Sequence, residues 1–248
     1  MVKRVLVTIY FLVAAVLYIL IYGTVVLFIG LIIRIFADKN KARKFIDGQI
    51  KIFGKNAFRF MFSPVIVMGQ ENVCERCLVV ANHQSLMDIP LILGYVGPMP
   101  MVAKKELSRV PGVNWFVKYM GGFFLDRDNP AEGAQVIKKI IKTLSSGNSL
   151  LIFPEGTRSV DGTVGRFKTA IFKIAKKLNV KVLPISIWGT ISLVPKRSLF
   201  LNPGPVSMII HPPISPNDFP SEEMLAQKVE ETVRLGVERL KATGGDSK

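Results

Sequence analysis

The chain begins with a long apolar run. Residues Val5 to Ile33 carry no charged side chain, and a helix of that length reaches roughly 44 Å, more than the ~30 Å of bilayer hydrocarbon. Gly23 and Gly30 interrupt its second half, so a single tilted span and a bent or hairpin insertion are both open. The run is about twice as long as the apolar part of a signal peptide, and no small-residue cleavage site follows it. We therefore predict a retained hydrophobic helical membrane anchor.

Basic residues flank this apolar run unevenly. Only Lys3 and Arg4 precede the run, whereas five basic residues follow it closely: Arg34, Lys39, Lys41, Arg43 and Lys44. By the positive-inside rule, this excess predicts that the rest of the chain lies at the cytoplasmic face of the cell membrane. A hairpin would put both flanks on that same face. Residues 45–62 then interleave phenylalanine and isoleucine with Lys51, Lys55 and Arg59, a pattern typical of a basic amphipathic helix on a membrane surface.

From residue 63 onward the pattern alternates between strand-like and helix-like segments. Short apolar runs predict strands at residues 65–68, 78–81, 100–103, 150–153, 180–187 and 206–210. Apolar positions at helical spacing predict helices after Pro130, at residues 167–178 and after Ser221. Such alternation predicts an α/β fold with a mixed, largely parallel central sheet flanked by helices. We therefore divide the chain into membrane-anchoring helices, residues 1–62, and an α/β domain, residues 63–248.

The charge of the chain suits an anionic partner. The 33 basic residues exceed the 18 acidic ones and give a net charge of +15. These charges are spread through amphipathic segments with no arginine-rich arm, so anionic phospholipid of the membrane is favoured and no nucleic acid is expected. Cys74 and Cys77 have no second cysteine pair with which to complete a zinc site, and Cys77 opens a strand rather than a strand-to-helix turn. We interpret both as thiols and assign them no function.

One histidine carries the strongest chemical signal. His83 is one of two histidines in 248 residues and lies five positions before Asp88. On one helix, five residues rotate by roughly 500°, which separates the two side chains. They meet only if a strand ends near His83 and a helix begins near Asp88, as Pro90 suggests. The pair then forms a general base with a fixed ring, although Asp88 as a helix N-cap and His83 as a structural histidine are alternatives; a strand-to-helix junction also allows Asp88 to do both.

Further polar motifs follow the ends of other predicted strands. Lys105, Arg127 and the segment Phe153–Ser159, which contains Arg158, occupy such positions. Ligands of α/β folds gather at the carboxyl ends of strands, so the basic residues are expected to converge on His83 and to bind a phosphate. The chain has neither a GxSxG nucleophile motif nor a GxxxxGK[ST] phosphate loop, and a catalytic zinc site is unconvincing. The remaining possibility is a base that activates a hydroxyl of the substrate.

Four blocks of this sequence resemble those of the glycerolipid acyltransferases, in the family's order. The blocks are Asn82-His83-Gln84-Ser85-x-x-Asp88, Gly122-x-x-Leu125-Asp126-Arg127, Phe153-Pro154-Glu155-Gly156-Thr157-Arg158-Ser159 and Val182-Leu183-Pro184-Ile185. They cover about residues 80–190, and the lysophosphatidate (1-acyl-sn-glycerol-3-phosphate) acyltransferases are most similar. Leu125 stands where isoleucine is frequent, a departure that puts nothing in doubt.

The resemblance implies a reaction and a set of site residues. His83, oriented by Asp88, takes the proton of the acceptor's free hydroxyl while that oxygen attacks an acyl thioester directly. The implied substrate-binding residues are Lys105, Arg127, Glu155, Gly156, Thr157 and Arg158. The basic residues hold the phosphate of lysophosphatidate, whereas Glu155 and Gly156 shape the acceptor pocket. Acyl carrier protein or coenzyme A supplies the acyl group as a co-substrate, with no further cofactor and no metal.

Three alternatives stay open at this point. A member of the same family acting on glycerol-3-phosphate or on a lyso-ornithine lipid shares the four blocks. A membrane-bound lipid hydrolase would use His83 and Asp88 to activate water. A lipid-binding module without activity would explain the anchor and the charge but leaves the His83–Asp88 pair without a role.

Overall fold

The apolar run forms one continuous helical rod. The computed structural model of the protein describes residues 2–110, 112–126, 130–195 and 200–244. The rod comprises α1 (Val2–Leu17), a π-helical turn η1 (Tyr18–Tyr22) and α2 (Gly23–Phe36), and its segment Val5–Phe36 is long and apolar enough to cross a bilayer. The helix continues through Gly23 and Gly30, so the expected alternative of a hairpin within the run is wrong.

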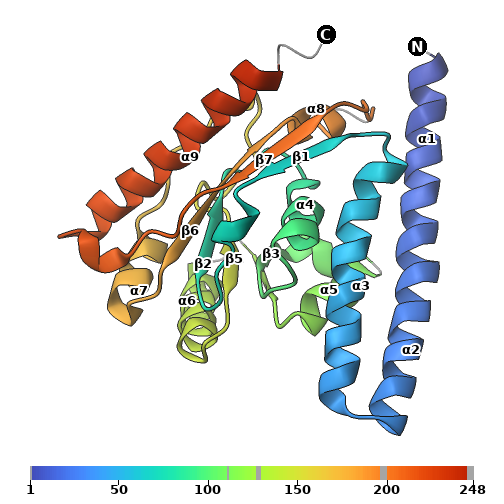
Figure 1. The fold of residues 1–248 in the computed structure, drawn as a ribbon, viewed down its shortest axis with the longest axis horizontal. Helices are drawn as coiled ribbons and strands as arrows, with labels where there is room; N and C mark the ends of the chain where they lie inside the picture. Colours follow the sequence, from blue (N-terminus) through green and yellow to red (C-terminus); the bar gives the residue numbers. More distant parts are fainter. Residues whose placement is uncertain (1, 111, 127–129, 196–199, 245–248) are drawn as a thin grey trace.

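The chain reverses only after the rod and returns beside it as α3 (Lys39–Phe60) (Figure 1). Asp38 caps this helix, because its carboxylate accepts hydrogen bonds from the amides of Asn40 and Lys41 at 2.7 and 2.8 Å. The amphipathic helix predicted at residues 45–62 therefore starts earlier than expected. Its buried positions recur every four residues: Ala42, Ile46, Ile50, Gly54 and Phe58.

A central sheet organises the rest of the chain. Its order is β1 (Val65–Met68), β7 (Val206–Ile210), β6 (Val182–Trp188), β2 (Leu78–Ala81) and β5 (Leu150–Ile152). The β6–β7 pair is antiparallel, and the other three neighbouring pairs are parallel. A parallel pair, β3 (Val102–Lys104) and β4 (Phe123–Leu125), is joined to this sheet by a bridge between Met101 and Leu151. The predicted mixed, largely parallel sheet is confirmed.

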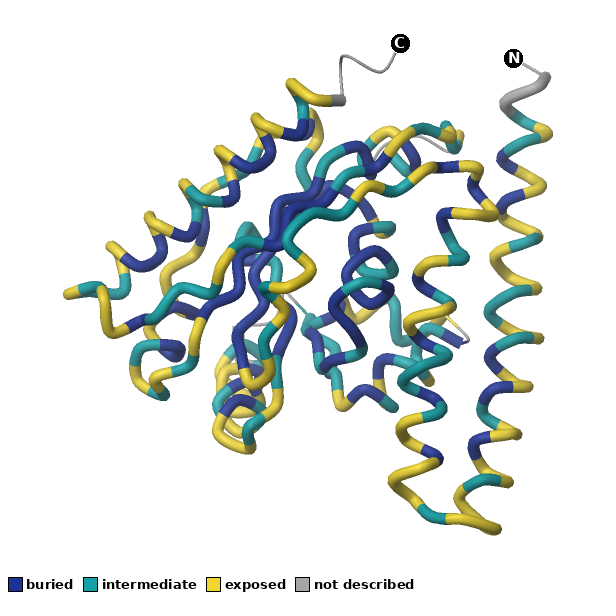
Figure 2. Tube along the Cα trace, viewed as in Figure 1, coloured by how far each residue is buried: buried dark blue, intermediate teal, exposed yellow. Residues whose placement is uncertain are grey.

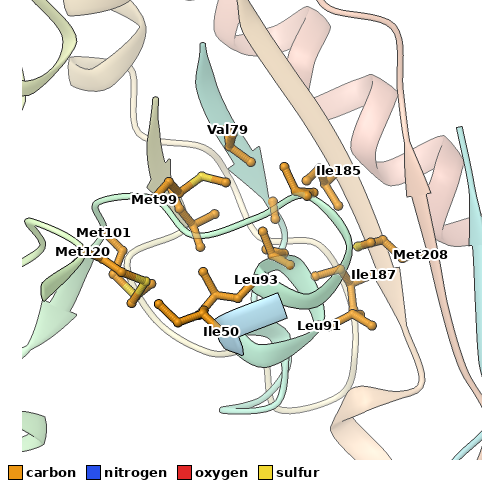
Figure 3. Packing of buried hydrophobic residues seen from close by; sticks show 14 of the residues in the cluster. Ile50, Val79, Leu91, Leu93, Met99, Met101, Met120, Ile185, Ile187 and Met208 are labelled. Carbon is orange, nitrogen blue, oxygen red and sulfur yellow. The ribbon is translucent and has the colours of Figure 1, made fainter. Parts of the chain in front are cut away.

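Helices cover both faces of this sheet. One face packs against α3, α4 (Asp88–Tyr95) and α5 (Val113–Tyr119), and the other against α6 (Pro130–Ser145), α7 (Ala170–Leu178) and α9 (Glu222–Gly244). Figure 2 shows the strands as the buried centre and the outer side of the rod as exposed. In Figure 3, Ile50 and Leu93 lie between the helices and the sheet residues Val79 and Ile185.

The remaining elements are short. They are the 3₁₀ turns η2 (Gln70–Asn72), η3 (Lys105–Arg109) and η4 (Pro216–Asp218) and the helix α8 (Thr190–Leu193). Helix α7 begins three residues later than predicted. The predicted start of the last helix is confirmed, because the Ser221 hydroxyl accepts a hydrogen bond from the Met224 amide at 3.3 Å. Both cysteines, Cys74 and Cys77, are free thiols, as interpreted from the sequence.

Candidate active site

The site begins where the fully buried strand β2 ends. Asn82, the next residue, extends the pairing of β2 with β6 through its side chain. Its amide nitrogen donates to the Ile187 carbonyl at 3.0 Å, and its amide oxygen accepts from the Ile187 backbone amide at 2.8 Å. All four polar atoms are buried and hydrogen-bonded. The backbone that leads into the next residue, His83, is therefore held in place.

His83 and Asp88 meet at the junction predicted from their spacing. The strand ends at Ala81 and the helix α4 begins at Asp88, so His83 Nδ1 lies 2.8 Å from Asp88 Oδ2. The carboxylate is fully buried. Its Oδ2 also accepts hydrogen bonds from the backbone amides of Gln84 and Ser85, at 2.7 and 2.8 Å.

The alternative role of Asp88 as a helix N-cap is wrong. A capping oxygen accepts from amides in the first turn of its helix, whereas this carboxylate points back and accepts from the turn that precedes the helix. The residue at the N-cap position is Met87, and its side chain makes no capping hydrogen bond. Asp88 therefore orients His83 and closes the loop between β2 and α4, without capping the helix.

The imidazole is held on a second side by an aromatic ring. Phe153 stacks on it with the ring centroids 4.0 Å apart and the planes 19° apart. His83 is only 8 % exposed, so its orientation is fixed by the carboxylate and the phenyl ring together. Because Nδ1 faces Asp88, Nε2 is the ring nitrogen that can take a proton from a substrate.

The segment Phe153–Ser159 follows β5 and is attached to His83 by its backbone. Glu155 Oε1 accepts from the His83 amide at 2.9 Å, and the Ser159 amide donates to the His83 carbonyl at 2.8 Å. The other oxygen of Glu155 accepts from the Gly165 amide at 3.1 Å. Burial outweighs these hydrogen bonds and raises the pKa of Glu155 to about 7. Glu155 thus holds two loops together, a role that the sequence motif does not reveal.

The other predicted residues of this segment, Gly156, Thr157 and Arg158, differ in their surroundings. A cavity of about 390 Å³ is lined by Gly156, by Phe153 and by apolar side chains of α6 and α7. Gly156 has φ +76°, and a side chain there would be strained and would contact Lys168. Thr157 is exposed and Arg158 is half-buried. The hydrogen bond from the Ser159 amide to the His83 carbonyl brings the backbone that follows Arg158 close to the backbone of His83.

Lys105 already forms ion pairs with two carboxylates. Its Nζ lies 3.1 Å from Asp126 Oδ2 and 2.9 Å from Glu132 Oε1, and these contacts raise its pKa. A phosphate would have to compete with both acids, so the role of Lys105 stays a prediction. Arg127, the third predicted basic residue, lies outside the described residues.

One polar contact of the site has no counterpart in the sequence motifs. Thr190 lies just after β6, and its hydroxyl is 2.5 Å from Asp88 Oδ1. The only signal in the sequence is a polar residue that follows a buried strand. That signal is shared by many residues of an α/β fold, so the sequence alone does not single out Thr190.

A comparison with known protein families identifies the class of protein to which this chain belongs. The family model described as Acyltransferase matches residues 64–188, which include both members of the pair. The protein therefore belongs to the Acyltransferase family, and the resemblance predicted from the four sequence blocks is confirmed.

Individual relatives fall within the same family. The crystal structure of the 1-acyl-sn-glycerophosphate (LPA) acyltransferase PlsC from Thermotoga maritima shares 47% identity and a TM-score of 0.89, over 97% of both chains. The chloroplastic 1-acyl-sn-glycerol-3-phosphate acyltransferase of Brassica napus is 36% identical over 62% of this chain and 46% of its own. That of Saccharomyces cerevisiae is 33% identical over 73% and 61%. The chain thus spans about half the length of the Brassica relative.

Proposed function

We propose that this protein transfers a fatty acyl group from a thioester, carried by acyl carrier protein or coenzyme A, to the sn-2 hydroxyl of lysophosphatidate. The product is phosphatidate, a precursor of phospholipids. The observation that carries the proposal is the buried contact of 2.8 Å between His83 Nδ1 and Asp88 Oδ2. The names of the relatives from Thermotoga maritima, Brassica napus and Saccharomyces cerevisiae support the choice of acceptor.

The proposed reaction needs one base and no acyl-enzyme. With Nδ1 donating to the carboxylate of Asp88, Nε2 of His83 accepts the proton of the acceptor hydroxyl. The hydroxyl oxygen forms the new bond to the carbonyl carbon of the thioester, and the carbon–sulfur bond breaks. The proton then passes to the leaving thiolate. The charge that develops on Nε2 is stabilised by the carboxylate, which the backbone amides of the preceding turn already hold in place.

Arg158 is the residue that we propose for the acceptor's phosphate. Its neighbour in the chain, Ser159, donates its backbone amide to the His83 carbonyl, which holds the backbone at Arg158 close to the backbone of His83. Arginine offers a planar, permanently charged fork that suits phosphate oxygens. In this arrangement the phosphate and the reacting hydroxyl are held on the same side of the β2 and β5 strand ends.

We also propose that the rod acts at a membrane surface, with the α/β domain on the cytoplasmic side. Its outward residues are strongly exposed and apolar, for example Leu6, Phe28 and Ile35 at 61, 62 and 65 %. Helix α3 lies along the opposite side of α2, and it carries seven exposed basic residues: Lys39, Lys41, Arg43, Lys44, Lys51, Lys55 and Arg59. A rod that crossed the bilayer would carry α3 into hydrocarbon, at about 3 kcal/mol for each charge near the centre. Entry of the outward face alone avoids that cost.

The decisive experiment compares the two histidines of the chain. Acyl incorporation into lysophosphatidate is measured for wild type, His83→Ala and His211→Ala, with both thioester donors. We expect His83→Ala to lower kcat by about 10²- to 10⁴-fold and His211→Ala to change it by less than about threefold. Near-normal turnover of folded His83→Ala would refute the mechanism. Release of free fatty acid without an acceptor would instead favour the hydrolase, and faster reaction with glycerol-3-phosphate or a lyso-ornithine lipid would change the acceptor.

A second experiment addresses the phosphate. We expect Arg158→Ala to raise the KM for lysophosphatidate by about tenfold or more, because it removes a hydrogen bond to a charged group. The KM for the thioester should stay within about twofold. Lysophosphatidate with its phosphate removed serves as the matched acceptor, and the variant should use it no worse than wild type does. An unchanged KM for lysophosphatidate would contradict the assignment of Arg158.

A further inference from the structure

The carboxylate of Asp88 is held from two different parts of the chain. Its Oδ2 accepts from His83 and from two amides of the same loop. Its Oδ1 accepts from the hydroxyl of Thr190, 102 positions away in the sequence, at 2.5 Å. Asp88 and Thr190 are both fully buried, so this hydrogen bond is shielded from water and has a carboxylate as its acceptor, which makes it a strong one.

The turn after β6 places Thr190 at this point. Strand β6 is buried over its first six residues, and Gly189 follows it with φ +94°. A Cβ on Gly189 would lie 2.3 Å from the Pro205 carbonyl oxygen, so the chain can turn here only with glycine. The paired contacts between Asn82 and Ile187 fix the ends of β2 and β6 against each other. Thr190 is therefore as firmly placed as His83.

The single proton of the Thr190 hydroxyl has two possible acceptors. Gln84 Oε1 is 3.4 Å away, whereas Asp88 Oδ1 is 2.5 Å away. The shorter contact leads to the charged acceptor, so the hydroxyl donates to Asp88. With Oδ1 held in this way, the carboxylate cannot rotate, and Oδ2 stays directed at His83 Nδ1.

We propose that Thr190 is a positioning residue for the His83–Asp88 pair. It fixes the rotation of the carboxylate and stabilises its charged form, so that the imidazole keeps Nε2 free as the base. The proposal rests on the function proposed above, but it concerns a strand end that lies outside the segment containing the histidine and the aspartate. Thr190 touches neither substrate nor the reacting atoms.

A purely structural role is the competing explanation, because Thr190 also fills space in the core. Two substitutions separate the roles. Thr190→Val keeps the shape and removes the hydroxyl, whereas Thr190→Ser keeps the hydroxyl and removes a methyl group. The matched control is Ser186→Ala, which removes another fully buried hydroxyl, from β6, the strand that precedes Thr190. Ser186 binds His211 and the Val233 carbonyl.

Steady-state kinetics with lysophosphatidate test the proposal. We expect Thr190→Val to lower kcat by about 10- to 100-fold, the equivalent of a hydrogen bond to a charged group, with both KM values within about twofold. Thr190→Ser should remain within about threefold of wild type. Ser186→Ala should lose thermal stability with kcat unchanged.

Proton NMR gives a readout that does not need turnover. The Nδ1 proton of His83, shared with the carboxylate, should give a far-downfield signal in wild type and Thr190→Ser. In Thr190→Val that signal should be lost. Unchanged kcat and an unchanged signal in Thr190→Val would overturn the positioning role, and so would equal losses in Thr190→Val and Thr190→Ser. An inactive wild type that shows this pattern of signals would reject the proposed function alone.

Discussion

The two histidines of this chain lie in similar surroundings but differ in the group that binds the imidazole ring. Each follows a buried strand, β2 for His83 and β7 for His211, and each has one ring nitrogen 2.8 Å from a buried oxygen. His83 faces the carboxylate of Asp88. His211 faces the hydroxyl of Ser186, whose own proton goes to the Val233 carbonyl at 2.8 Å. His211 must therefore donate from Nε2, and burial, helped by Arg239, lowers its pKa to about 4.

The comparison shows that the partner, more than the burial, decides what a histidine can do. A carboxylate partner stabilises the imidazolium that a general base becomes, which suits His83 to the role proposed for it. A neutral hydroxyl gives no such support. His211 instead donates to Ser186, whose hydroxyl joins β6 to the Val233 carbonyl of α9. The sheet adds a second difference. Because β6 and β7 are antiparallel, the carboxyl end of β7 lies at the opposite end of the sheet from the carboxyl ends of β2 and β6.

Removal of the charge from Asp88 should have the largest effect. Asp88→Asn replaces one carboxylate oxygen by an amide group that cannot accept hydrogen bonds, although Oδ2 accepts three and Oδ1 one. We expect kcat to fall by about 100-fold or more, measured from initial rates of acyl transfer by variant protein whose fold is verified by circular dichroism. The exposed Asp218→Asn is the matched control and should keep wild-type kcat. More than about a tenth of the activity in Asp88→Asn would mean that His83 does not depend on its carboxylate.

The sequence predicted the His83–Asp88 contact because the two residues are close in the chain. Five residues cannot bring both side chains to one helix face, so a strand-to-helix junction was the arrangement that remained, and the structure has it. The alternation of apolar patterns likewise predicted the sheet, since buried strands of this length have few other interpretations. Local geometry was sufficient in both cases.

Contacts between distant segments could not be predicted in this way. Thr190 reaches Asp88 only through the order of strands in the sheet, and the sequence does not state that β6 neighbours β2. The carboxylate of Glu155 was expected near the acceptor, but its two oxygens bind backbone amides of separate loops. Gly30 suggested a break in the apolar helix. A Cβ there would lie 2.7 Å from Ile46 of α3, so this glycine serves close packing instead.

Two buried groups should give the stability of the protein opposite dependences on pH. The folded-state pKa of His211 is about 4, below its ordinary value of 6.5, so the unfolded chain binds the proton first and stability is lost as pH falls from about 6.5 to 4. The pKa of Glu155 is about 7, above its ordinary value of 4.5. Its contribution is fully present below pH 4.5 and is lost as pH rises through 7. Each amounts to about 3 kcal/mol, so between pH 4.5 and 6.5 the two slopes largely cancel.

Single substitutions should reveal how each group alone changes the free energy of unfolding with pH. The free energy of unfolding is measured by denaturant titration at several pH values from 4.5 to 6.5. With His211→Gln, whose amide can still donate to Ser186, only the Glu155 term remains, and stability should decrease as pH rises. With Glu155→Gln the His211 term remains, and stability should increase as pH rises, although the loss of one acceptor lowers stability at every pH by about 1–3 kcal/mol. If both variants keep the wild-type slope, neither group changes its protonation on folding, and the contrast between the two histidines then rests on the contact between His83 and Asp88 alone.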